Sequence, residues 1–458
     1  MPARVRLYLF AIFASLAAPA LQAQPYALDD GRGIPTIAPI VSQITDAVVN
    51  IAVVSEQAPF VSPLFNDPFF RDFFDFPMEM DPQPRLSAGS GVIVDAENGL
   101  ILTNNHVVES GEQISVTLTD GRSMEATVIG SDPETDIAVL QITADGLKAL
   151  PLGDSDQVQV GDFVIAVGNP FGIGQTVTTG IVSALGRSGI NPEGYEDFIQ
   201  TDASINPGNS GGALVTLDGK LIGINTAIIA PTGGNVGIGF AVPINMAKAV
   251  QSQLIDFGEV RRGRLGVVIQ DLTPDLAEAL GVTPGQGAII VRVEPGTAAD
   301  AAGLQAGDIV VSVDGTPIEG AGDLRNLIGL SNPDQVVTMT VIRDDEEITV
   351  SATLVAGGGP AMRRGAPEGG EAIEGAELAE LTSGMPGYGD VEGVAIISVT
   401  PGSAASRAGL RAWDIIMSVN NRAVTTVAEL QKAIAEQRPG PVALSVYRDG
   451  GAFYAILR

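Results

Sequence analysis

Ser210 is the residue whose surroundings most clearly indicate covalent chemistry. It lies in the sequence INPGNSGGAL, after Gly208 and Asn209 and before Gly211. Glycines permit a tight turn that brings backbone N–H groups together and lets a carbonyl group approach. We expect Gly208, Asn209 and Ser210 to form an oxyanion hole. In it, the amides of Gly208 and Ser210 stabilise the charge that develops during acyl transfer.

A serine hydroxyl is a poor nucleophile until a neighbouring base removes its proton. The chain has one histidine, His106 in GLILTNNHVV, so a base of histidine type must be this residue. Asp136 opens the apolar run DIAVLQI, where an unpaired buried carboxylate would be costly. Accepting the Nδ1–H of His106 would satisfy that carboxylate and fix the imidazole tautomer. The sequence therefore predicts that His106, Asp136 and Ser210 are catalytic residues of an acyl-transfer reaction.

The composition excludes several other classes of function. The 458 residues include 25 Lys and Arg against 54 Asp and Glu, a net charge of −29. This charge would repel a phosphate backbone, so no nucleic-acid partner is expected. With no cysteine and one histidine, disulfides, thiolate chemistry and multi-histidine metal sites are excluded. We expect neither a metal nor a cofactor.

The N-terminus has the pattern of a secretory signal peptide. Arg4 and Arg6 precede an apolar run over residues 7–20, and the small Ala23 follows shortly. This run is short for a membrane span, and no later stretch approaches the required length. We expect residues 1–23 to be cleaved and the mature chain to be exported, without a membrane span. An uncleaved anchor or an N-terminal helix is the alternative.

The candidate catalytic residues lie among short predicted strands. From residue 48 to residue 243, β-branched runs alternate with turn residues and no helical pattern intervenes, which favours antiparallel barrels or a sandwich. Residues 244–258 then carry apolar residues at helical spacing, with Asn245 as the expected N-cap and Gly258 as the stop. We expect this helix to end a first domain over residues 24–258.

The C-terminal half repeats itself. Residues 287–315 match residues 393–421 without a gap. Two copies predict two small domains of one type, because each must bury its own core. We place them at residues 259–355 and 371–458, joined by a Gly-rich flexible linker over residues 356–370.

An insertion over residues 57–84 stands apart from this pattern. Its segment Phe60–Phe76 holds seven of the fifteen phenylalanines, with no helical or strand period. So many aromatic rings must bury against something, since exposed patches of that size are uncommon. A loop folded back on its own domain, a lid and a self-association arm all remain open.

The motifs TNNHVV, TDIAVL and GNSGGAL resemble the catalytic signatures of the HtrA (Deg) family of exported serine proteases. The order His106, Asp136, Ser210 is that of chymotrypsin-like enzymes. The resemblance covers essentially the whole chain. It implies a mainly β fold, with a trypsin-like double β-barrel protease domain followed by two PDZ domains of α+β type.

The resemblance also implies a function. It is that of an ATP-independent periplasmic serine endopeptidase that degrades misfolded or unfolded exported proteins. It further implies some chaperone activity, homotrimers and larger assemblies of trimers. The alternative is a catalytically silent PDZ scaffold or holdase on a protease fold, against which the intact set of catalytic residues argues. An esterase using the same residues is a third interpretation, which the peptide-binding features disfavour.

Further site residues follow from the resemblance. The edge that pairs with substrate and lines the specificity pocket comprises Thr226, Ala227, Ile228, Ile229 and Ala230. Its two isoleucines would make the pocket small and apolar, which predicts cleavage after Val or Ala.

Two charged residues bear on this pocket and on regulation. Ser204 stands six positions before Ser210, where a trypsin-type pocket has an acidic residue, although the nearby Asp202 leaves a basic preference open. Arg187 resembles an arginine in a regulatory loop of the family, and a plain surface charge is the alternative.

Arg264, Leu265, Gly266 and Val267 have the pattern of a PDZ loop that binds a C-terminal carboxylate through backbone amides. The ungapped alignment places Glu371–Ile373 at this position in the second copy, where an acidic side chain and a missing glycine would disfavour a carboxylate. We therefore expect the first PDZ domain to bind C-terminal peptides, and the second to serve structure or assembly.

Overall fold

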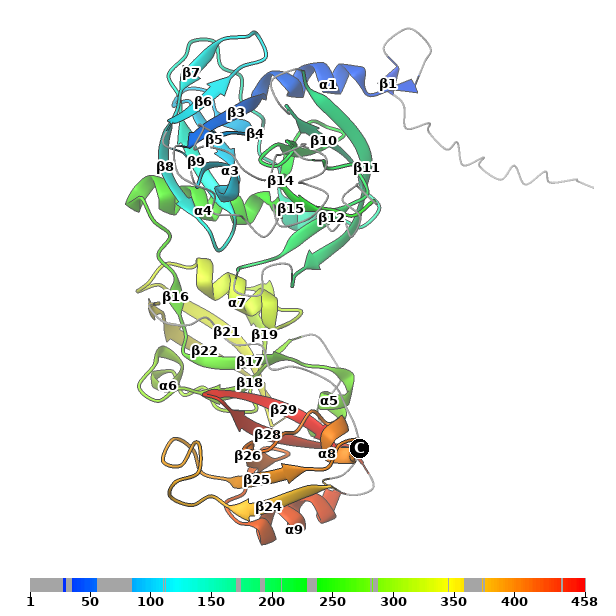
Figure 1. Ribbon diagram of the computed structural model, residues 1–458, viewed down its shortest axis with the longest axis vertical. Coiled ribbons are helices and arrows are strands. Elements are labelled where there is room, and N and C mark those ends of the chain that lie inside the picture. Colours follow the sequence, from blue (N-terminus) through cyan, green and yellow to red (C-terminus); the bar gives the residue numbers. More distant parts are fainter. Residues whose placement is uncertain are drawn as a thin grey trace, which may run out of the picture.

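The computed structural model describes the chain in segments separated by gaps. The segments are residues 28–29, 35–55, 85–109, 111, 113–169, 174–189, 194–206, 208–228, 237–280, 282, 287–344, 346–357, 373, 375–437 and 440–457. The expected signal peptide (1–23), the insertion at 57–84 with Phe60–Phe76, and residues 358–370 of the expected linker lie outside the described residues. Figure 1 shows β-structure at one end of the long axis and the C-terminal domains at the other.

The first β-structure, here called the N-terminal sheet, is antiparallel in the order β7-β6-β3-β4-β5-β9-β8. Along β3, Val49, Ile51 and Val53 face one core, whereas Val48 belongs to a second core shared with the rest of the domain. This alternation is what a strand between two apolar layers requires. The strands are β3 (Val48–Ser55), β4 (Arg85–Asp95), β5 (Leu100–Thr103), β6 (Gln113–Thr117), β7 (Ser123–Glu125), β8 (Thr127–Asp132) and β9 (Ile137–Gln141).

The second β-structure is a closed barrel in the order β10-β11-β12-β15-β14-β13. Ile199, Leu214 and Ala241 are among the residues that fill it. Closure pairs every strand on both sides and so leaves no exposed edge. The strands are β10 (Phe163–Gly168), β11 (Thr176–Arg187), β12 (Phe198–Thr201), β13 (Ala213–Thr216), β14 (Leu221–Ile228) and β15 (Gly239–Pro243).

Helix α4 (Ile244–Phe257) joins the two β-structures, because it packs against β8 and β9 of the sheet and against β14 and β15 of the barrel (Figure 1). Gly258 ends the helix at a φ of +76°, as predicted. The prediction of Asn245 as the N-cap is wrong. Pro243 occupies that position, and the Asn245 side chain instead donates to Asp154 Oδ1 at 2.7 Å.

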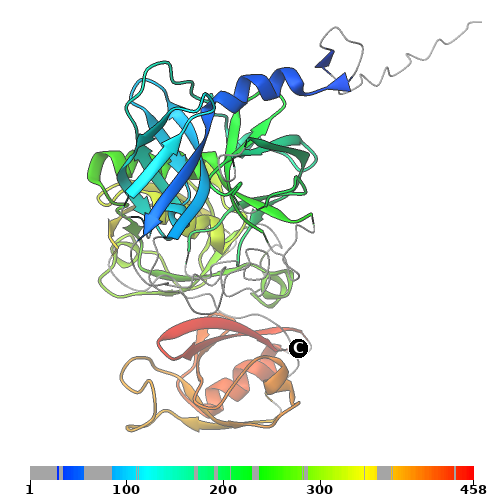
Figure 2. The ribbon, with the colours of Figure 1, turned by 45° about the horizontal axis from the view of Figure 1, so that its top comes forward.

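Shorter helical segments complete this domain. Helix α1 lies over the β-structures on the side away from the C-terminal domains (Figure 2). It buries Ile40 and Ile44 in the core that the sheet and the barrel share. These segments are β1 (Leu28–Asp29), β2 (Pro35–Thr36), α1 (Ala38–Ile44), η1 (Thr45–Ala47), α3 (Asn105–Val108) and η3 (Ser155–Gln157).

The two C-terminal domains share one plan, in which helices cover an antiparallel sheet. Each has a buried ion pair at the same place, Asp308 with Arg343 and Asp414 with Arg448, both at 2.6 Å. Removing either arginine would leave its buried aspartate unpaired, which destabilises a domain by about 3–5 kcal/mol.

The strands β17 to β22 and the helices α6 and α7 of the first domain recur in the same order as β24 to β29, α8 and α9 of the second. The first has β16 (Gly263–Arg264), β17 (Val267–Asp271), α5 (Pro274–Leu280), β18 (Ala288–Val293), α6 (Ala298–Ala301), β19 (Ile309–Val313), β20 (Thr316–Pro317), α7 (Ala321–Leu330), β21 (Val336–Arg343), β22 (Glu346–Thr353) and β23 (Val355–Ala356). The second has β24 (Ala376–Glu380), β25 (Val394–Val399), α8 (Ala404–Arg407), β26 (Ile415–Val419), β27 (Arg422–Ala423), α9 (Val427–Gln437), β28 (Val442–Arg448) and β29 (Gly451–Leu457).

The structure corrects the ungapped alignment of the two copies. Gly375, not Ala372, occupies the position of Gly266. Both glycines have a positive φ, +96° and +84°, and a Cβ on either would clash, with Ser403 and Thr297 respectively. The second copy is three residues shorter than the first between this glycine and the matched segment, which displaces the ungapped alignment by three positions here. The glycine that the sequence comparison counted as lost from the second domain is retained.

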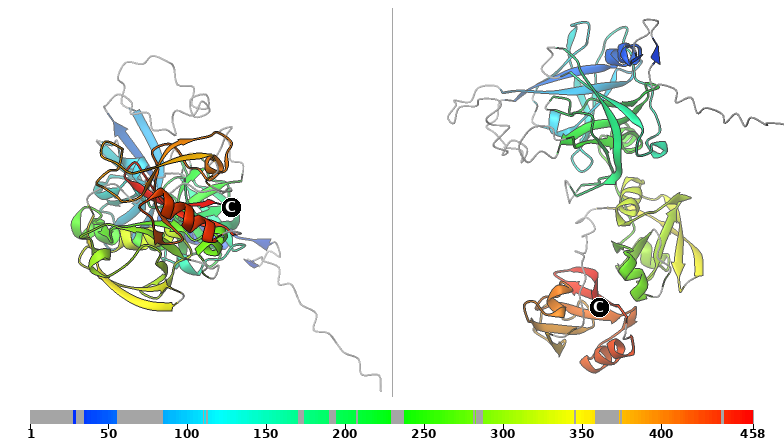
Figure 3. Two further views of the ribbon diagram at one scale, coloured as in Figure 1. Left: turned by 90° about the horizontal axis from the view of Figure 1, so that it is seen from below. Right: turned by 90° about the vertical axis from the view of Figure 1, so that its right-hand side faces the viewer.

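The two C-terminal domains pack against each other (Figures 1 and 3). Val268 and Ile289, on the outer face of the first domain's sheet, share a buried cluster with Ala452 and Tyr454 of β29. The Tyr454 N–H also donates to Gln270 Oε1 at 2.8 Å. The contact is therefore sheet on sheet, with polar contacts beside the apolar ones.

Carboxylates gather where α7 approaches the closed barrel. Burial, together with the charges of Asp323, Asp156 and Glu319, raises the pKa of Asp197 to about 7. A carboxyl group whose pKa rises on docking takes up a proton when the contact forms. The resulting stabilisation is complete below about pH 4, the pKa of a free aspartate, and is lost as the pH rises through 7.

We therefore expect the contact between α7 and residues 194–201 to loosen with rising pH in the wild type and much less in Asp197→Asn. Hydrogen–deuterium exchange of these segments, corrected for the intrinsic rate, measures the opening between pH 5 and 8. One linked proton allows opening to increase by up to about tenfold per pH unit. Asp218→Asn, at an exposed ion pair with Lys220, is the control. An unchanged pH dependence in Asp197→Asn would contradict the assignment.

Candidate active site

His106 and Asp136 come together at one end of the N-terminal sheet. His106 lies on α3, directly after β5, and Asp136 ends the turn between β8 and β9 with a φ of +56°. The His106 Nδ1 lies 2.9 Å from Asp136 Oδ2, and the His106 backbone N–H donates to Asp136 Oδ1 at 3.0 Å. Two contacts to one carboxylate fix both the backbone and the ring, which leaves Nε2 as the free ring nitrogen.

Thr226 connects this pair to Ser210. Its hydroxyl donates to Asp136 Oδ2 at 2.5 Å, and its carbonyl oxygen accepts from Ser210 Oγ at 2.9 Å. Sequence reasoning placed Thr226 only on the substrate edge and missed both contacts. Asp136 and Thr226 are 90 positions apart, and no local spacing signals such a pairing.

The electrostatics of the site raise the proton affinity of the His106 imidazole. Burial lowers the pKa of His106, but the charge and hydrogen bond of Asp136 and the charge of Glu109 outweigh it. The pKa of His106 is therefore raised above its usual value. An imidazole in this setting holds a proton firmly once it has accepted one.

The turn that carries Ser210 depends on glycine. Gly208 and Gly211 have φ angles of +92° and +80°, which other residues rarely adopt. A Cβ on Gly211 would also clash with the Ser90 carbonyl oxygen. Asn209, between Gly208 and Ser210, is buried beneath the turn. The side chain of Ser210 is thereby carried at the junction of the sheet and the barrel.

The substrate edge predicted from the sequence coincides in part with β14. Thr226 is described in full, and the strand continues to Ile228, whose backbone pairs with Gly239. The side chains of Ala227 and Ile228, and all of Ile229 and Ala230, lie outside the described residues.

The charged residues named with this edge have partners elsewhere. Asp202 is exposed, and its Oδ1 accepts the Ile181 N–H at 2.7 Å. Arg187 is exposed at the end of β11 and donates from Nε to Gln200 Oε1 at 3.1 Å. Neither contact reaches the Ser210 hydroxyl.

The predicted carboxylate loop lies at the start of the first C-terminal domain. Gly266 takes its left-handed conformation there, and the Arg264 guanidinium pairs with Glu294. Leu265 is fully buried and packs in the domain core. Arg264, Gly266 and Val267 line a cavity of about 1030 Å³ that also reaches Glu134 of the N-terminal sheet.

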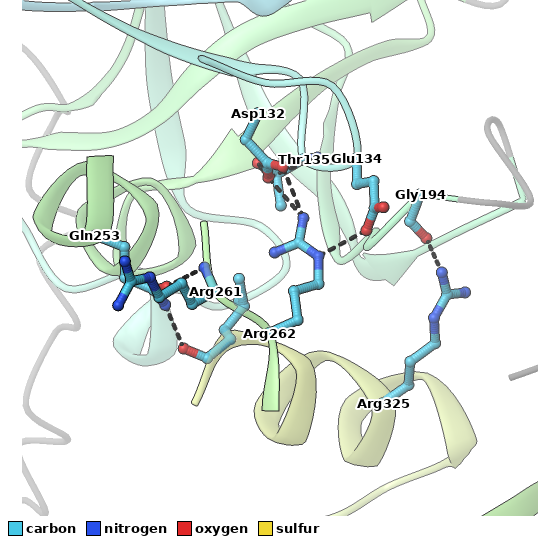
Figure 4. A network of polar contacts seen from close by, with 9 residues as sticks. Asp132, Glu134, Thr135, Gly194, Gln253, Arg261, Arg262 and Arg325 are labelled. Atoms are coloured by element: carbon cyan, nitrogen blue, oxygen red, sulfur yellow. Dashed lines mark hydrogen bonds and ion pairs between the residues drawn. The ribbon is translucent and has the colours of Figure 1, made fainter. Parts of the chain in front are cut away.

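Arg262 ties this domain to the turn that ends in Asp136 (Figure 4). Its Nη2 donates to both Asp132 oxygens at 2.8 Å, and its Nε donates to Glu134 Oε2 at 2.6 Å. The side chain of Arg262 is only 12% exposed. Sequence reasoning missed this residue, because its partners lie some 130 positions away.

A second contact reaches the same turn through Tyr195. The guanidinium groups of Arg262 and Arg325 both lie over its ring, 4.3 and 4.7 Å from the ring centroid. The Tyr195 N–H donates to the Glu134 carbonyl oxygen at 2.7 Å. Arg325 donates to the Gly194 carbonyl oxygen at 2.6 Å (Figure 4). The first C-terminal domain thus contacts both the turn and residues 194–196.

Comparison with known proteins shows what this arrangement belongs to. Residues 89–224 match the trypsin-like peptidase domain, and residues 263–354 and 373–452 match the PDZ domain. The chain is 43% identical over 437 residues to the periplasmic pH-dependent serine endoprotease DegQ of Escherichia coli K12, covering 95% of this chain and 94% of that protein. It is 41% identical over 447 residues to the periplasmic serine endoprotease DegP of Salmonella typhimurium LT2, covering 93% and 92%.

A solved structure agrees. The HtrA-type protease AlgW with a tripeptide aligns at a TM-score of 0.57 and 41% identity, over 71% of this chain and 99% of that one. Fold and matches together define a serine endopeptidase with a trypsin-like domain followed by two PDZ domains, which confirms the predicted fold class. The chain belongs to the HtrA (Deg) family of serine endoproteases, as the resemblance predicted.

The names of these relatives support a periplasmic location. Among the residues that the structure describes, no helix is both long and apolar enough to cross a membrane.

A base must be neutral to accept a proton, so we predict that the pKa of His106 sets the rising limb of the pH–rate profile. Because Asp136 raises this pKa, we expect the midpoint of the rising limb of kcat/KM to lie above pH 6.5, the usual pKa of histidine. Asp136→Asn should lower kcat by about 10⁴ and move the limb of the residual activity to lower pH. Hydrolysis of a short chromogenic peptide between pH 5 and 9 measures both. Asp120→Asn, which changes an exposed aspartate, is the control. If Asp136→Asn leaves the midpoint of the rising limb unchanged, the pairing of His106 with Asp136 is contradicted.

Proposed function

We propose that this chain is an ATP-independent periplasmic endopeptidase that degrades misfolded or unfolded exported proteins through an acyl-enzyme. The observation that carries the proposal is the continuous set of contacts from His106 to Asp136, from Asp136 to the Thr226 hydroxyl and from the Thr226 carbonyl to Ser210. Export would follow from cleavage of residues 1–23 as a signal peptide.

In the proposed mechanism Ser210 Oγ attacks the scissile carbonyl while His106 Nε2 takes its proton. Asp136 stabilises the imidazolium that forms, and His106 then returns the proton to the leaving amine. The amides of Gly208 and Ser210 stabilise the oxyanion. Water, deprotonated by His106, then attacks the acyl carbon and displaces Ser210 Oγ, which takes the proton back from His106. The Ser210 hydroxyl, which donates to Thr226 in the structure, must turn to His106 before attack.

We also propose a preference for small aliphatic side chains such as Val or Ala before the cleaved bond. Thr226 to Ala230 would pair with the substrate strand, and Ile228 and Ile229 would line its pocket. Asp202 is directed at the Ile181 N–H, which supports the proposal that its carboxylate does not serve as the partner of a Lys or Arg side chain of the substrate.

The PDZ domains suggest peptide binding, and we propose that the first one captures C-terminal peptides. Its loop from Arg264 to Val267 would bind the carboxylate, and the left-handed Gly266 supports this. Since Gly375 retains the same conformation, the second domain is no longer set apart by its glycine. Homotrimers, larger assemblies of trimers and some chaperone activity, which the family resemblance implies, are part of the proposal.

We propose that capture is linked to catalysis through the domain junction. Arg262 and Tyr195 contact the turn that carries Asp136, and Arg187 would be a regulatory residue close in sequence to that junction. The raised pKa of Asp197 supports a pH-sensitive junction. The relative DegQ is named pH-dependent, which agrees with this.

Digestion of unfolded casein by the full chain tests the proposed function. We expect Ser210→Ala and His106→Ala each to lose at least about 10²-fold in rate, since general acid–base catalysis alone contributes about 10²–10⁴. The double variant should be no slower than either single one, because these residues act as a unit. Ser42→Ala, which removes an exposed hydroxyl of α1, is the control.

Casein digestion that persists in Ser210→Ala would contradict the assigned nucleophile. Undetectable digestion by the wild type, with and without an added C-terminal peptide, would favour the alternative of a silent PDZ scaffold or holdase.

A further inference from the structure

We infer that Ser90 is a positioning residue that fixes the oxyanion turn from the opposite β-structure. The inference rests on the proposed role of residues 208–210. Ser90 lies on β4 of the N-terminal sheet, paired with Asn50, and is completely buried. Gly208 and Ser210 belong to the segment that leads into β13 of the closed barrel, so any contact with Ser90 crosses the junction between the two.

Ser90 holds the carbonyl groups of both residues whose amides face the oxyanion. Its hydroxyl donates to the Gly208 carbonyl oxygen at 2.5 Å, and its backbone N–H donates to the Ser210 carbonyl oxygen at 2.8 Å. Its own carbonyl accepts from Thr103 Oγ1 at 2.7 Å. Ser90 is thus itself held in place by the strand that leads to His106.

These contacts matter because the turn is intrinsically flexible. Glycine reaches left-handed and right-handed conformations with similar ease, so Gly208 and Gly211 alone leave several orientations open to the peptide groups between them. Rotation of a peptide group exchanges the directions of its N–H and its C=O. The Gly208 carbonyl shares its peptide group with the Asn209 N–H, and the Ser210 carbonyl shares its peptide group with the Gly211 N–H. These two groups flank the one that carries the Ser210 N–H, so fixing both of them restricts the rotation of the group between them. Donors fixed before reaction stabilise an oxyanion without reorganisation.

The hydroxyl of Ser90 has a second partner. Asn169, at the end of β10, donates its backbone N–H to Ser90 Oγ at 2.7 Å, and its carbonyl oxygen accepts from Asn50 Nδ2 at 2.9 Å. Ser90 Oγ therefore donates and accepts at once, which a hydroxyl can do and a methyl group cannot. In Ser90→Ala the Gly208 carbonyl and the Asn169 N–H lose this shared partner.

The test compares Ser90→Ala, Ser90→Thr and Ser155→Ala with the wild type in the full chain. Ser155 is a buried serine of η3 whose hydroxyl accepts the Asn245 N–H. Ser155→Ala therefore also removes a buried hydroxyl that accepts a backbone N–H, but at a distance from the turn. For a short chromogenic peptide, we expect Ser90→Ala to lower kcat by about tenfold to a hundredfold, less than deletion of a donor outright (about 10²–10³). KM should stay within about twofold.

A transition-state analogue provides the readout that a structural role would not move. The affinity for a peptide boronate should fall in Ser90→Ala in proportion to kcat, because its tetrahedral adduct uses the same donors. Ser90→Thr should recover both, since it restores the hydroxyl. Ser155→Ala should keep both even if its Tm falls. If Ser90→Ala does not fold, Ser90→Cys, a weak donor of similar size, replaces it with the same expected pattern.

Wild-type kcat and boronate affinity in folded Ser90→Ala would overturn the inference and leave the proposed function standing. A lower Tm with unchanged boronate affinity, or no recovery in Ser90→Thr, would also overturn it. Failure of the proposed function looks different, because Ser210→Ala would then hydrolyse the peptide as fast as the wild type.

Discussion

The whole site depends on one carboxylate at the junction of two β-structures. Asp136 is 24% exposed and accepts from the His106 N–H, from His106 Nδ1 and from the Thr226 hydroxyl. A carboxylate so placed is costly unless it is paired. The N-terminal sheet supplies two of these donors and the closed barrel the third. The pairing therefore ties the packing of the two β-structures to the orientation of His106, the proposed base.

Ser90 provides the reciprocal connection. The N-terminal sheet reaches across through Ser90 and Asn50 to hold the turn of Ser210 and the end of β10, whereas the barrel reaches back through Thr226 to hold Asp136. The apolar core shared between the sheet, the barrel and α4 keeps these partners at bonding distance. The chemistry is thus distributed over both sides of one interface, and neither side carries it alone.

The sequence allowed prediction of the residues with chemistry and of the fold class, because short motifs and strand periodicity are local signals. His106, Asp136 and Ser210 were predicted in this way as candidate catalytic residues. Contacts between distant residues left no such signal, so the hydrogen bonds of Thr226 and the ion pairs of Arg262 came only from the structure.

Two local expectations failed for identifiable reasons. Asn245 has a side chain suited to capping, but Pro243 already occupies the N-cap and Asp154 offers Asn245 a partner. The ungapped alignment of the two PDZ copies failed before the segment that matched, because the second copy is three residues shorter there, which places Gly375 at the position of Gly266.

The most direct test of the account is labelling of the full chain with a fluorophosphonate probe, followed by mass spectrometry of the modified peptide. The account predicts that the phosphonyl group is found on Ser210 under at least one of three conditions: the chain alone, an added C-terminal peptide, or mild heating. It also predicts that this label disappears in His106→Ala. Absence of label under every condition, or label on another residue while proteolysis continues, would contradict it.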